Sequence, residues 1–236
     1  MARSSRDTDG RRRGLLLWTT ATLLLAGIVW AAPKPVKEPV APSAAQAAQW
    51  LAQGNQRYCA GKPQHPRQDA ARRGELVAGQ HPFAVVLSCA DSRVPPEVLF
   101  DQGLGDLFVV RTAGEVVDNA ALGSLEYGAE HLHVPLLLVL GHERCGAVAA
   151  TLEAVEKGGT AEGGIGFLIN AIKPAVVAAK DQPGEKLHNC VIEQVRRVMA
   201  QLTESKPILA ELAEAGKLKI VGAVYGLETG AVEFLK

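Results

Sequence analysis

Four short apolar runs, rich in valine and leucine, recur along the chain, and each is bounded by glycine, proline or polar residues. They cover residues 83–88, 107–111, 135–141 and 219–225. Runs of this length without polar alternation are typical of strands that are buried on both faces of a sheet. The stretch 228–235 follows a glycine, and we expect it to return as an edge strand antiparallel to the fourth run.

Helical patterns fill the intervals between these runs. Within 119–133, for example, Leu122, Leu125, Ala129 and Leu132 recur at the spacing of one helix face. Helices are also predicted over 43–58, 146–157, 165–180 and 185–202. Apolar strands that alternate with helices predict an α/β fold, with a mostly parallel central sheet of about four strands, an antiparallel edge strand and helices on both faces.

The first 31 residues have the layout of an export signal, since five arginines precede an apolar stretch over 15–32. We expect cleavage after Ala31 and release into the bacterial periplasm. The alternative is an uncleaved inner-membrane anchor facing the periplasm, because the apolar stretch is borderline in length for a membrane span. The Arg12-Arg13 pair also resembles a twin-arginine signal.

The remaining chain reads as a linker followed by one domain. Four prolines stiffen residues 32–43 and forbid a helix there, whereas 44–236 is long enough to bury a sizeable core. Lys plus Arg and Asp plus Glu both number 25, so the net charge is zero. We therefore expect no nucleic-acid partner, and membrane contact only through the leader.

Metal-binding residue types follow two of the predicted strands. Cys89 follows the first strand, while His142 and Cys145 follow the third. In parallel sheets, ligands gather beyond the carboxyl ends of the strands. Two thiolates and one imidazole suit zinc, and three protein ligands leave a fourth position for water or a carboxylate. Alternatively, Cys89 has only a packing role, as a small buried apolar residue that binds no metal.

Asp91 and Arg93 lie two residues apart in the loop after the first strand. Their side chains can form a charge-assisted, two-pronged contact that keeps Asp91 ionised and away from the metal. If that contact breaks, Asp91 is close enough to Cys89 to become a fourth metal ligand in a closed state. A generic pair of this kind is a surface ion pair that contributes little.

Six segments occur in an order that resembles the beta-class carbonic anhydrases. They are GNQRY, CADSRVPPE, FVVRTAGE, SLEYGAEHL, GHERCGAV and VGAVYGLETGAVEFL, and the resemblance spans roughly 50–235. It implies a catalytic domain over 44–236 that hydrates carbon dioxide reversibly to bicarbonate and a proton through zinc-bound hydroxide. It also implies one Zn²⁺ per chain and a dimer or tetramer with the site near the subunit interface.

The resemblance also implies roles for individual residues. Cys89, His142 and Cys145 match the zinc ligands, Asp91 and Arg93 the catalytic dyad, and Gln80, Gly146, Phe108 and Tyr127 the groups that contact the substrate. The chain departs from the family pattern at 111–115, where RTAGE replaces the usual RNAGN. Val86 stands where members with a regulatory bicarbonate site have tryptophan, so we expect that regulation to be absent.

Some alternatives remain open from the sequence. The same scaffold in related proteins can hydrolyse carbon disulfide or carbonyl sulfide, and a zinc or thiol sensor without turnover is a second possibility. The Asp91–Arg93 pair argues against a pure binding module, because metal retention alone does not need it. Cys59 and Cys190 are left over, either as a disulfide in an oxidising compartment or as unpaired thiols.

Overall fold

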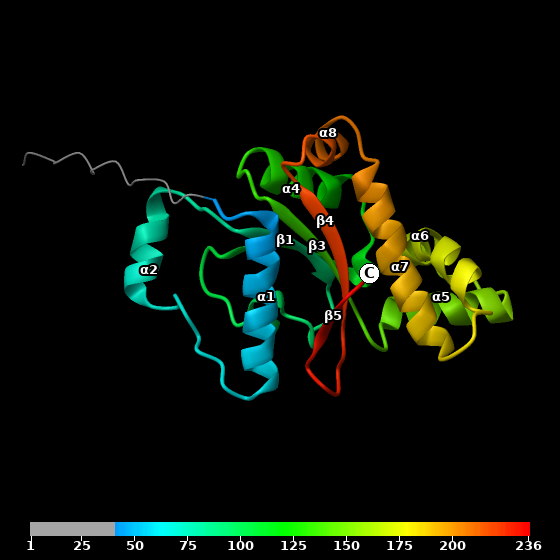
Figure 1. Ribbon diagram of the computed structural model, residues 1–236. Helices are drawn as coiled ribbons and strands as arrows, with labels where there is room; N and C mark the ends of the chain where they lie inside the picture. The colour runs from blue at the N-terminus through cyan, green and yellow to red at the C-terminus, as the bar shows by residue number, and fades with distance from the viewer. Residues whose placement is uncertain (1–40) are drawn as a thin grey trace, which may run out of the picture. The chain divides into compact units, whose positions relative to one another are not determined.

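A five-stranded sheet with the order β2-β1-β3-β4-β5 forms the centre of the computed structural model, which describes residues 41–236 (Figure 1). The expected signal peptide and residues 32–40 of the expected linker lie outside this range. The strands are β1 (Ala84–Cys89), β2 (Leu107–Thr112), β3 (Leu136–His142), β4 (Lys219–Tyr225) and β5 (Val232–Phe234). The first four pair in parallel and β5 pairs antiparallel to β4, which confirms the predicted α/β fold.

The side chains of β1 alternate between two apolar cores. Val85, Leu87 and Cys89 belong to one core, and Ala84 and Val86 to the other. Every residue of β1 and β3 is buried, as expected for central strands covered on both faces. This alternation places Cys89 on one defined side of the sheet.

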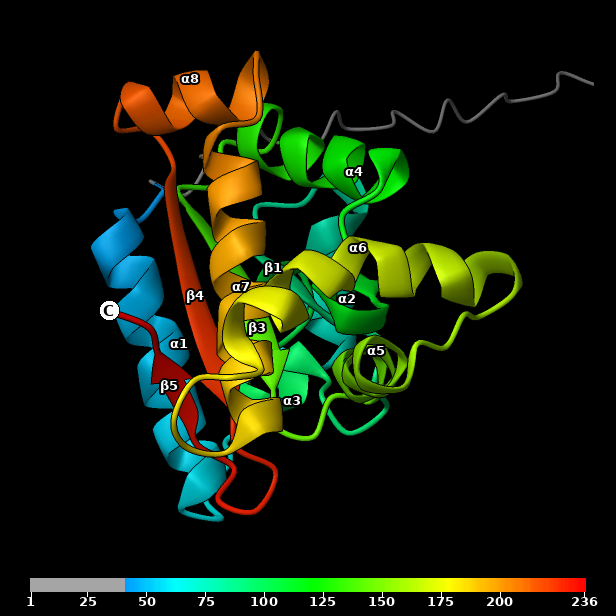
Figure 2. The same cartoon turned by 90° about the vertical axis from the view of Figure 1, so that its right-hand side faces the viewer.

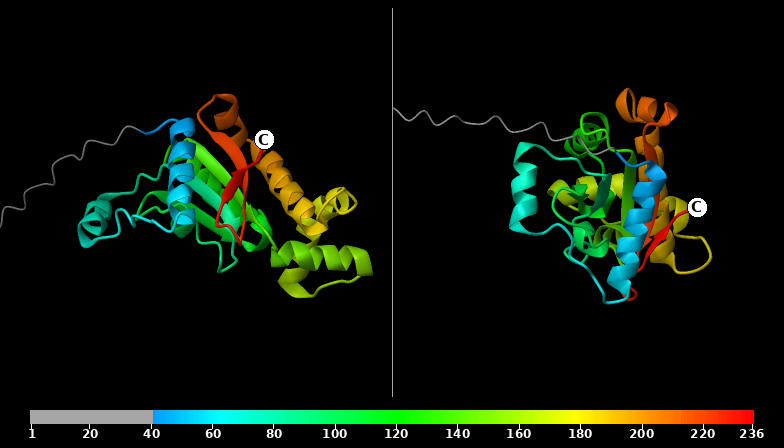
Figure 3. Two further views of the ribbon diagram at one scale, coloured as in Figure 1. Left: turned by 60° about the horizontal axis from the view of Figure 1, so that its bottom comes forward. Right: turned by 60° about the vertical axis from the view of Figure 1, so that its left-hand side comes forward.

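Helices cover both faces of the sheet. On one face lies α1 (Ala44–Cys59), as Figures 1 and 3 show, and the short α3 (Pro96–Leu99) packs into the same core. The other core is closed by α4 (Asn119–Glu130), α5 (Gly146–Lys157), α6 (Gly163–Ala179), α7 (Lys186–Thr203) and α8 (Ile208–Glu214). Of these, α6 packs against both α5 and α7 (Figure 2).

Three further short elements complete the described chain. They are α2 (Ala70–Glu75), which buries no residue, and the 3₁₀ turns η1 (Leu76–Ala78) and η2 (Ala113–Glu115). Among the described residues, no helix combines the length and the apolar character that crossing a membrane requires.

Two strand glycines allow α7 to approach the sheet closely. A Cβ atom on Gly222 of β4 would lie 2.3 Å from Met199 Sδ, and one on Gly141 of β3 would lie 2.5 Å from Val195 Cγ2. Side chains at these two positions would therefore push the helix away from the strands.

The order in which strands are added to the sheet reverses at β1, because β2 lies on one side of it and β3 on the other. At such a switch point in an open α/β sheet, the loops after the neighbouring strands diverge and leave a crevice beyond their carboxyl ends. The crevice between β1 and β3 is therefore the place where this topology favours a functional site.

Candidate metal centre

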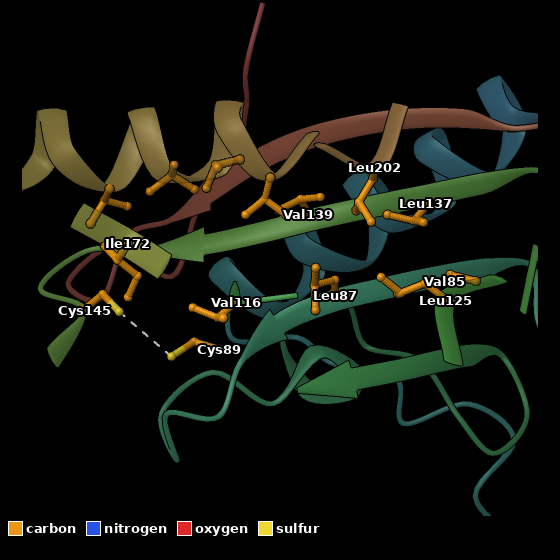
Figure 4. Close-up of a cluster of buried hydrophobic side chains, with 14 of the residues drawn as sticks. Val85, Leu87, Cys89, Val116, Leu125, Leu137, Val139, Cys145, Ile172 and Leu202 are labelled. Carbon is orange, nitrogen blue, oxygen red and sulfur yellow. Dashed lines mark hydrogen bonds between the residues drawn. The ribbon is translucent and has the colours of Figure 1, made fainter. Parts of the chain in front are cut away.

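Three predicted metal ligands meet beyond the carboxyl ends of β1 and β3. Cys89 is the last residue of β1, His142 is the last residue of β3, and Cys145 caps the N-terminus of α5. Their ligating atoms all lie within 4.8 Å of one another, and all three residues are buried. The two sulfur atoms are 3.9 Å apart and face each other (Figure 4). The strand pairing therefore brings together residues that are far apart in sequence.

The imidazole of His142 is oriented for metal binding. Its Nδ1 lies 2.8 Å from the carbonyl oxygen of Glu143, so Nδ1 carries the proton and donates it to that oxygen. The opposite nitrogen, Nε2, is buried and has no hydrogen-bond partner among residues 41–236. Such an unpartnered nitrogen is costly unless something binds it. Two thiol sulfurs and this nitrogen are the donor set that zinc prefers, so the residues fit a bound metal.

The two thiols affect each other's protonation. A hydrogen bond from Cys145, with further donors that include the backbone N–H of Gly114, lowers the pKa of the Cys89 thiol to about 4. The pKa of Cys145 is raised, because its hydrogen bond with Cys89 and its burial both favour the protonated thiol. One thiolate is thus formed readily, whereas the second needs a positive charge such as a metal ion beside it.

Asp91 and Arg93 form the two-pronged contact expected from their spacing. Arg93 donates through Nε to one carboxylate oxygen of Asp91 at 2.9 Å and through Nη2 to the other at 2.7 Å. These bonds hold the pKa of Asp91 well below its usual range. The same carboxylate lies 3.9 Å from His142 Nε2, so an ionised acceptor stands at the edge of the cluster.

Glu115, whose role the sequence did not suggest, lies buried near the cluster. Its side chain carries a buried oxygen, Oε1, without a hydrogen-bond partner. Burial, and then the charge of Cys89, raise its pKa well above the usual value for glutamate. The one available signal was the departure from the family pattern at 111–115, which puts an acid where asparagine is usual.

Only one of the four predicted substrate-contacting residues lies beside the cluster within one chain. Gly146 opens α5 directly after Cys145 and is exposed. Gln80 is an exposed residue that precedes β1, at the opposite end of this strand from Cys89. Phe108 pairs with Val85, four positions before Cys89, which corresponds to about 13 Å along a strand.

Tyr127 shares the surroundings of Phe108 rather than those of the cluster. It lies on α4, its side chain is exposed, and its ring centroid is 6.1 Å from that of Phe108. Gln80, Phe108 and Tyr127 are thus not brought to the metal ligands by the fold of a single chain.

Cys59 and Cys190 are free thiols in this structure. Cys59 ends α1 on one face of the sheet and is exposed, whereas Cys190 is buried in the core on the other face. The sheet lies between them, so of the two alternatives left open by the sequence the structure shows unpaired thiols.

Comparison with known proteins identifies relatives of this chain. The family model described as carbonic anhydrase matches residues 84–232. A carbonic anhydrase of Mycolicibacterium smegmatis is 44% identical over 194 residues, which cover 81% of this chain and 94% of the relative. Carbonic anhydrase 2 of Mycobacterium tuberculosis is 44% identical over 180 residues, covering 76% of this chain and 87% of the relative.

Solved structures with the same fold point to one class. A structure from a study of two tetrameric beta-carbonic anhydrases of Sordaria macrospora matches with a TM-score of 0.64 and 21% identity, covering 80% of this chain and 97% of its own. The Coccomyxa beta-carbonic anhydrase in complex with acetazolamide matches with a TM-score of 0.59 and 27% identity, covering 81% and 82% of the two chains. Close relatives by sequence and a shared fold lead to one conclusion: the chain belongs to the beta-class carbonic anhydrases.

Proposed function

We propose that this carbonic anhydrase holds one zinc ion per chain between Cys89, His142 and Cys145 and hydrates carbon dioxide reversibly to bicarbonate and a proton. The observation that carries the proposal is the buried, unpartnered Nε2 of His142 beside two facing thiols. A purely structural cluster would not need the ionised Asp91 that stands next to it.

The chemistry divides between the metal and the residues around it. When bound, zinc would lower the pKa of a water molecule to about 7, which makes hydroxide available near neutral pH. Asp91 then accepts the hydrogen bond of the attacking oxygen and orients its lone pair toward the carbon of carbon dioxide. Arg93 keeps Asp91 ionised and fixes the orientation of its carboxylate beside the cluster.

The negative charge that develops on the substrate oxygens needs a donor. The backbone N–H of Gly146 stands at the start of α5, where the unpaired amides and the helix dipole favour an anion. We propose that this N–H donates a hydrogen bond to bicarbonate. The side-chain amide of Gln80 would be the second donor.

The test is a stopped-flow measurement of carbon dioxide hydration with metal analysis of the same preparation. We expect about one zinc per chain, loss of activity after chelation and recovery on adding zinc. The Asp91→Asn variant should keep its zinc and lose most of its rate, while Asp69→Asn, at the N-cap of α2, should keep both. A zinc-loaded wild-type protein with no rate above buffer would refute the enzymatic proposal.

We also propose that two copies of the chain associate, so that a second copy supplies Gln80, Phe108 and Tyr127 to each site. The supporting observation is that these residues lie away from the cluster of their own chain. The Sordaria macrospora proteins of the same fold are described as tetrameric. A two-fold dimer would give each site the missing groups from its partner.

Mixing two inactive variants tests this arrangement. Asp91→Asn removes the acceptor and Tyr127→Ala removes the aromatic ring, so after subunit exchange a mixed dimer contains one complete site. Random exchange should restore about a quarter of the wild-type activity. If Tyr127 serves its own chain, the mixture will show no recovery, and light scattering will show whether the chain associates at all.

We further propose export to the periplasm, on the strength of the arginines and the apolar stretch that begin the chain. The mass of the protein recovered from a periplasmic extract should match a chain that begins at Ala32. A full-length protein in the membrane fraction would instead support the anchored alternative.

A further inference from the structure

The turn after β2 carries a hydrogen-bond donor to one of the metal-binding sulfurs. The backbone N–H of Gly114, in η2, donates to Cys89 Sγ at 3.4 Å, and this contact is buried. Gly114 has a φ of 67°, which a residue with a side chain rarely adopts. A Cβ atom at this position would also lie 2.6 Å from Ile172 Cδ1 of α6. The direction of this N–H therefore depends on a turn that is packed tightly between other elements.

A glutamine of α7 binds the carbonyl group of the same residue, Gly114. Gln194 of α7 is only 4% exposed, and its side-chain amide donates from Nε2 to the carbonyl oxygen of Gly114 at 2.9 Å. The two residues are 80 positions apart in the sequence. In residues 41–236, no other side chain donates a hydrogen bond to this carbonyl. Gly114 therefore links Gln194 of α7 to Cys89 Sγ through two hydrogen bonds.

We propose that Gln194 is a positioning residue of the metal centre. By holding the Gly114 carbonyl, it sets the orientation of η2 and keeps the Gly114 N–H directed at Cys89 Sγ. The inference rests on the proposed metal centre, and it adds a residue that touches neither the metal ligands nor the substrate.

The contacts from Gln194 through Gly114 affect the charge that Cys89 Sγ can donate to a metal. A hydrogen bond to a thiolate withdraws electron density from it, so the sulfur donates less charge to a bound metal. Groups that orient metal ligands typically change metal affinity by 10–100-fold when they are removed. Because Gln194 acts one bond further out, we expect a smaller effect, about 3–10-fold.

The surroundings of Gln194 allow it to be replaced without crowding. It borders a cavity of about 580 Å³ that is also lined by Val116, Pro174 and Val198. Gln194→Met keeps the length of the side chain and removes the donor, and the cavity leaves room for the methyl group. Gln194→Leu provides a second variant, since its side chain is apolar and cannot donate to a carbonyl at any pH.

The experiment uses the full-length protein loaded with cobalt(II), whose charge-transfer absorption reports directly on the thiolate ligands. The control is Val198→Ala, one helical turn away on α7, which removes buried apolar atoms but no hydrogen-bond donor. We expect both Gln194 variants to shift the sulfur-to-cobalt absorption to longer wavelength, because the sulfur regains the charge that the N–H withdraws. We also expect them to release the metal about 3–10-fold faster to a chelator, because η2 no longer holds Cys89 in a fixed orientation. The Val198→Ala variant should lower the melting temperature and leave the absorption unchanged.

Each outcome has a separate meaning. Unchanged absorption and release rate in both Gln194 variants would overturn the inference and leave Gln194 a core residue, and so would an equal shift in Val198→Ala. A wild-type protein that binds no cobalt or zinc would refute the proposed metal centre itself. If the wild type binds cobalt but does not hydrate carbon dioxide, the absorption still tests the role of Gln194.

Discussion

Two acidic residues near the cysteine pair, Asp91 and Glu115, have pKa values that are shifted in opposite directions by their surroundings. Arg93 pairs with Asp91 and holds its pKa low, so this carboxylate is ionised. Among residues 41–236 no positive side chain pairs with Glu115, and its burial raises its pKa. The first group is therefore held as an ionised acceptor, whereas the surroundings of the second favour its neutral, protonated form.

Replacing Arg93 tests the dependence of Asp91 on its partner. In Arg93→Gln the carboxylate loses the two-pronged contact and its fixed orientation. We expect the hydration rate to fall on the order of 100-fold while zinc stays at one per chain. Arg73→Gln changes an exposed arginine of α2 and should leave the rate as it is. An Arg93→Gln enzyme of normal rate would show that Asp91 needs no such support.

Replacing Glu115 tests its burial through the pH dependence of stability. An acid whose pKa is raised on folding stays protonated in the native state after the unfolded chain has lost its proton, so stability falls as the pH rises above about 4.5. Glutamine does not titrate, so Glu115→Gln should gain stability over the wild type by up to about 1.4 kcal/mol per pH unit across that window.

Denaturant unfolding of the reduced, metal-free proteins at several pH values between 5 and 8 measures this difference. Glu214→Gln, which removes an exposed carboxylate of α8, serves as the control for losing a glutamate at the surface. A Glu115→Gln difference that does not grow with pH would contradict the assignment of a neutral acid.

The sequence predicted the three candidate metal ligands but not the two buried polar residues behind them, Gln194 and Glu115. Cys89, His142 and Cys145 are chemically distinctive and follow strands, so their types and positions sufficed. Gln194 reads as an ordinary polar residue in a helix, and Glu115 reads as a loop residue. Their roles depend on tertiary contacts across the core, and no local pattern encodes such contacts.

At the scale of the elements, the long apolar strands and the long helices were predicted to within a few residues. The predicted helix over 146–157 and the predicted strand over 219–225 coincide with α5 and β4. The helices α2, α3 and α8 were not predicted. They span 6, 4 and 7 residues, which is too short for a periodic apolar face to emerge, and α3 begins at Pro96.

The close packing of α7 on the sheet predicts opposite effects for two glycine-to-alanine changes. Gly222→Ala should lower the free energy of unfolding by about 1–3 kcal/mol, because its methyl group would overlap Met199 and Val195. Gly123→Ala, inside α4 where the added atom meets nothing, should raise it by about 0.5–1 kcal/mol. Denaturant titrations compare both with the wild type, and a Gly222→Ala protein of unchanged stability would mean that α7 can move away from β4 at no cost.

At the scale of the whole molecule, a metal bound at the cluster as proposed would link the ends of two central strands. Ligand binding to the native state alone raises stability with the free ligand concentration. We therefore expect chelation to lower the melting temperature, and each tenfold rise in free zinc to add about 1.4 kcal/mol once the site is saturated. A Cys89→Ser variant should lose most of this dependence, and a wild-type melting temperature that ignores zinc would argue against a bridging metal.

The three candidate ligands come from the end of β1, the end of β3 and the start of α5, which are synthesised at different times. Cys89 emerges first, and the chain must still build β2, α4 and β3 before His142 and Cys145 exist. Even then the donors converge only when β3 has docked beside β1. Binding of the proposed metal would therefore come late in the folding of each molecule, and only after the central strands have paired in the correct order.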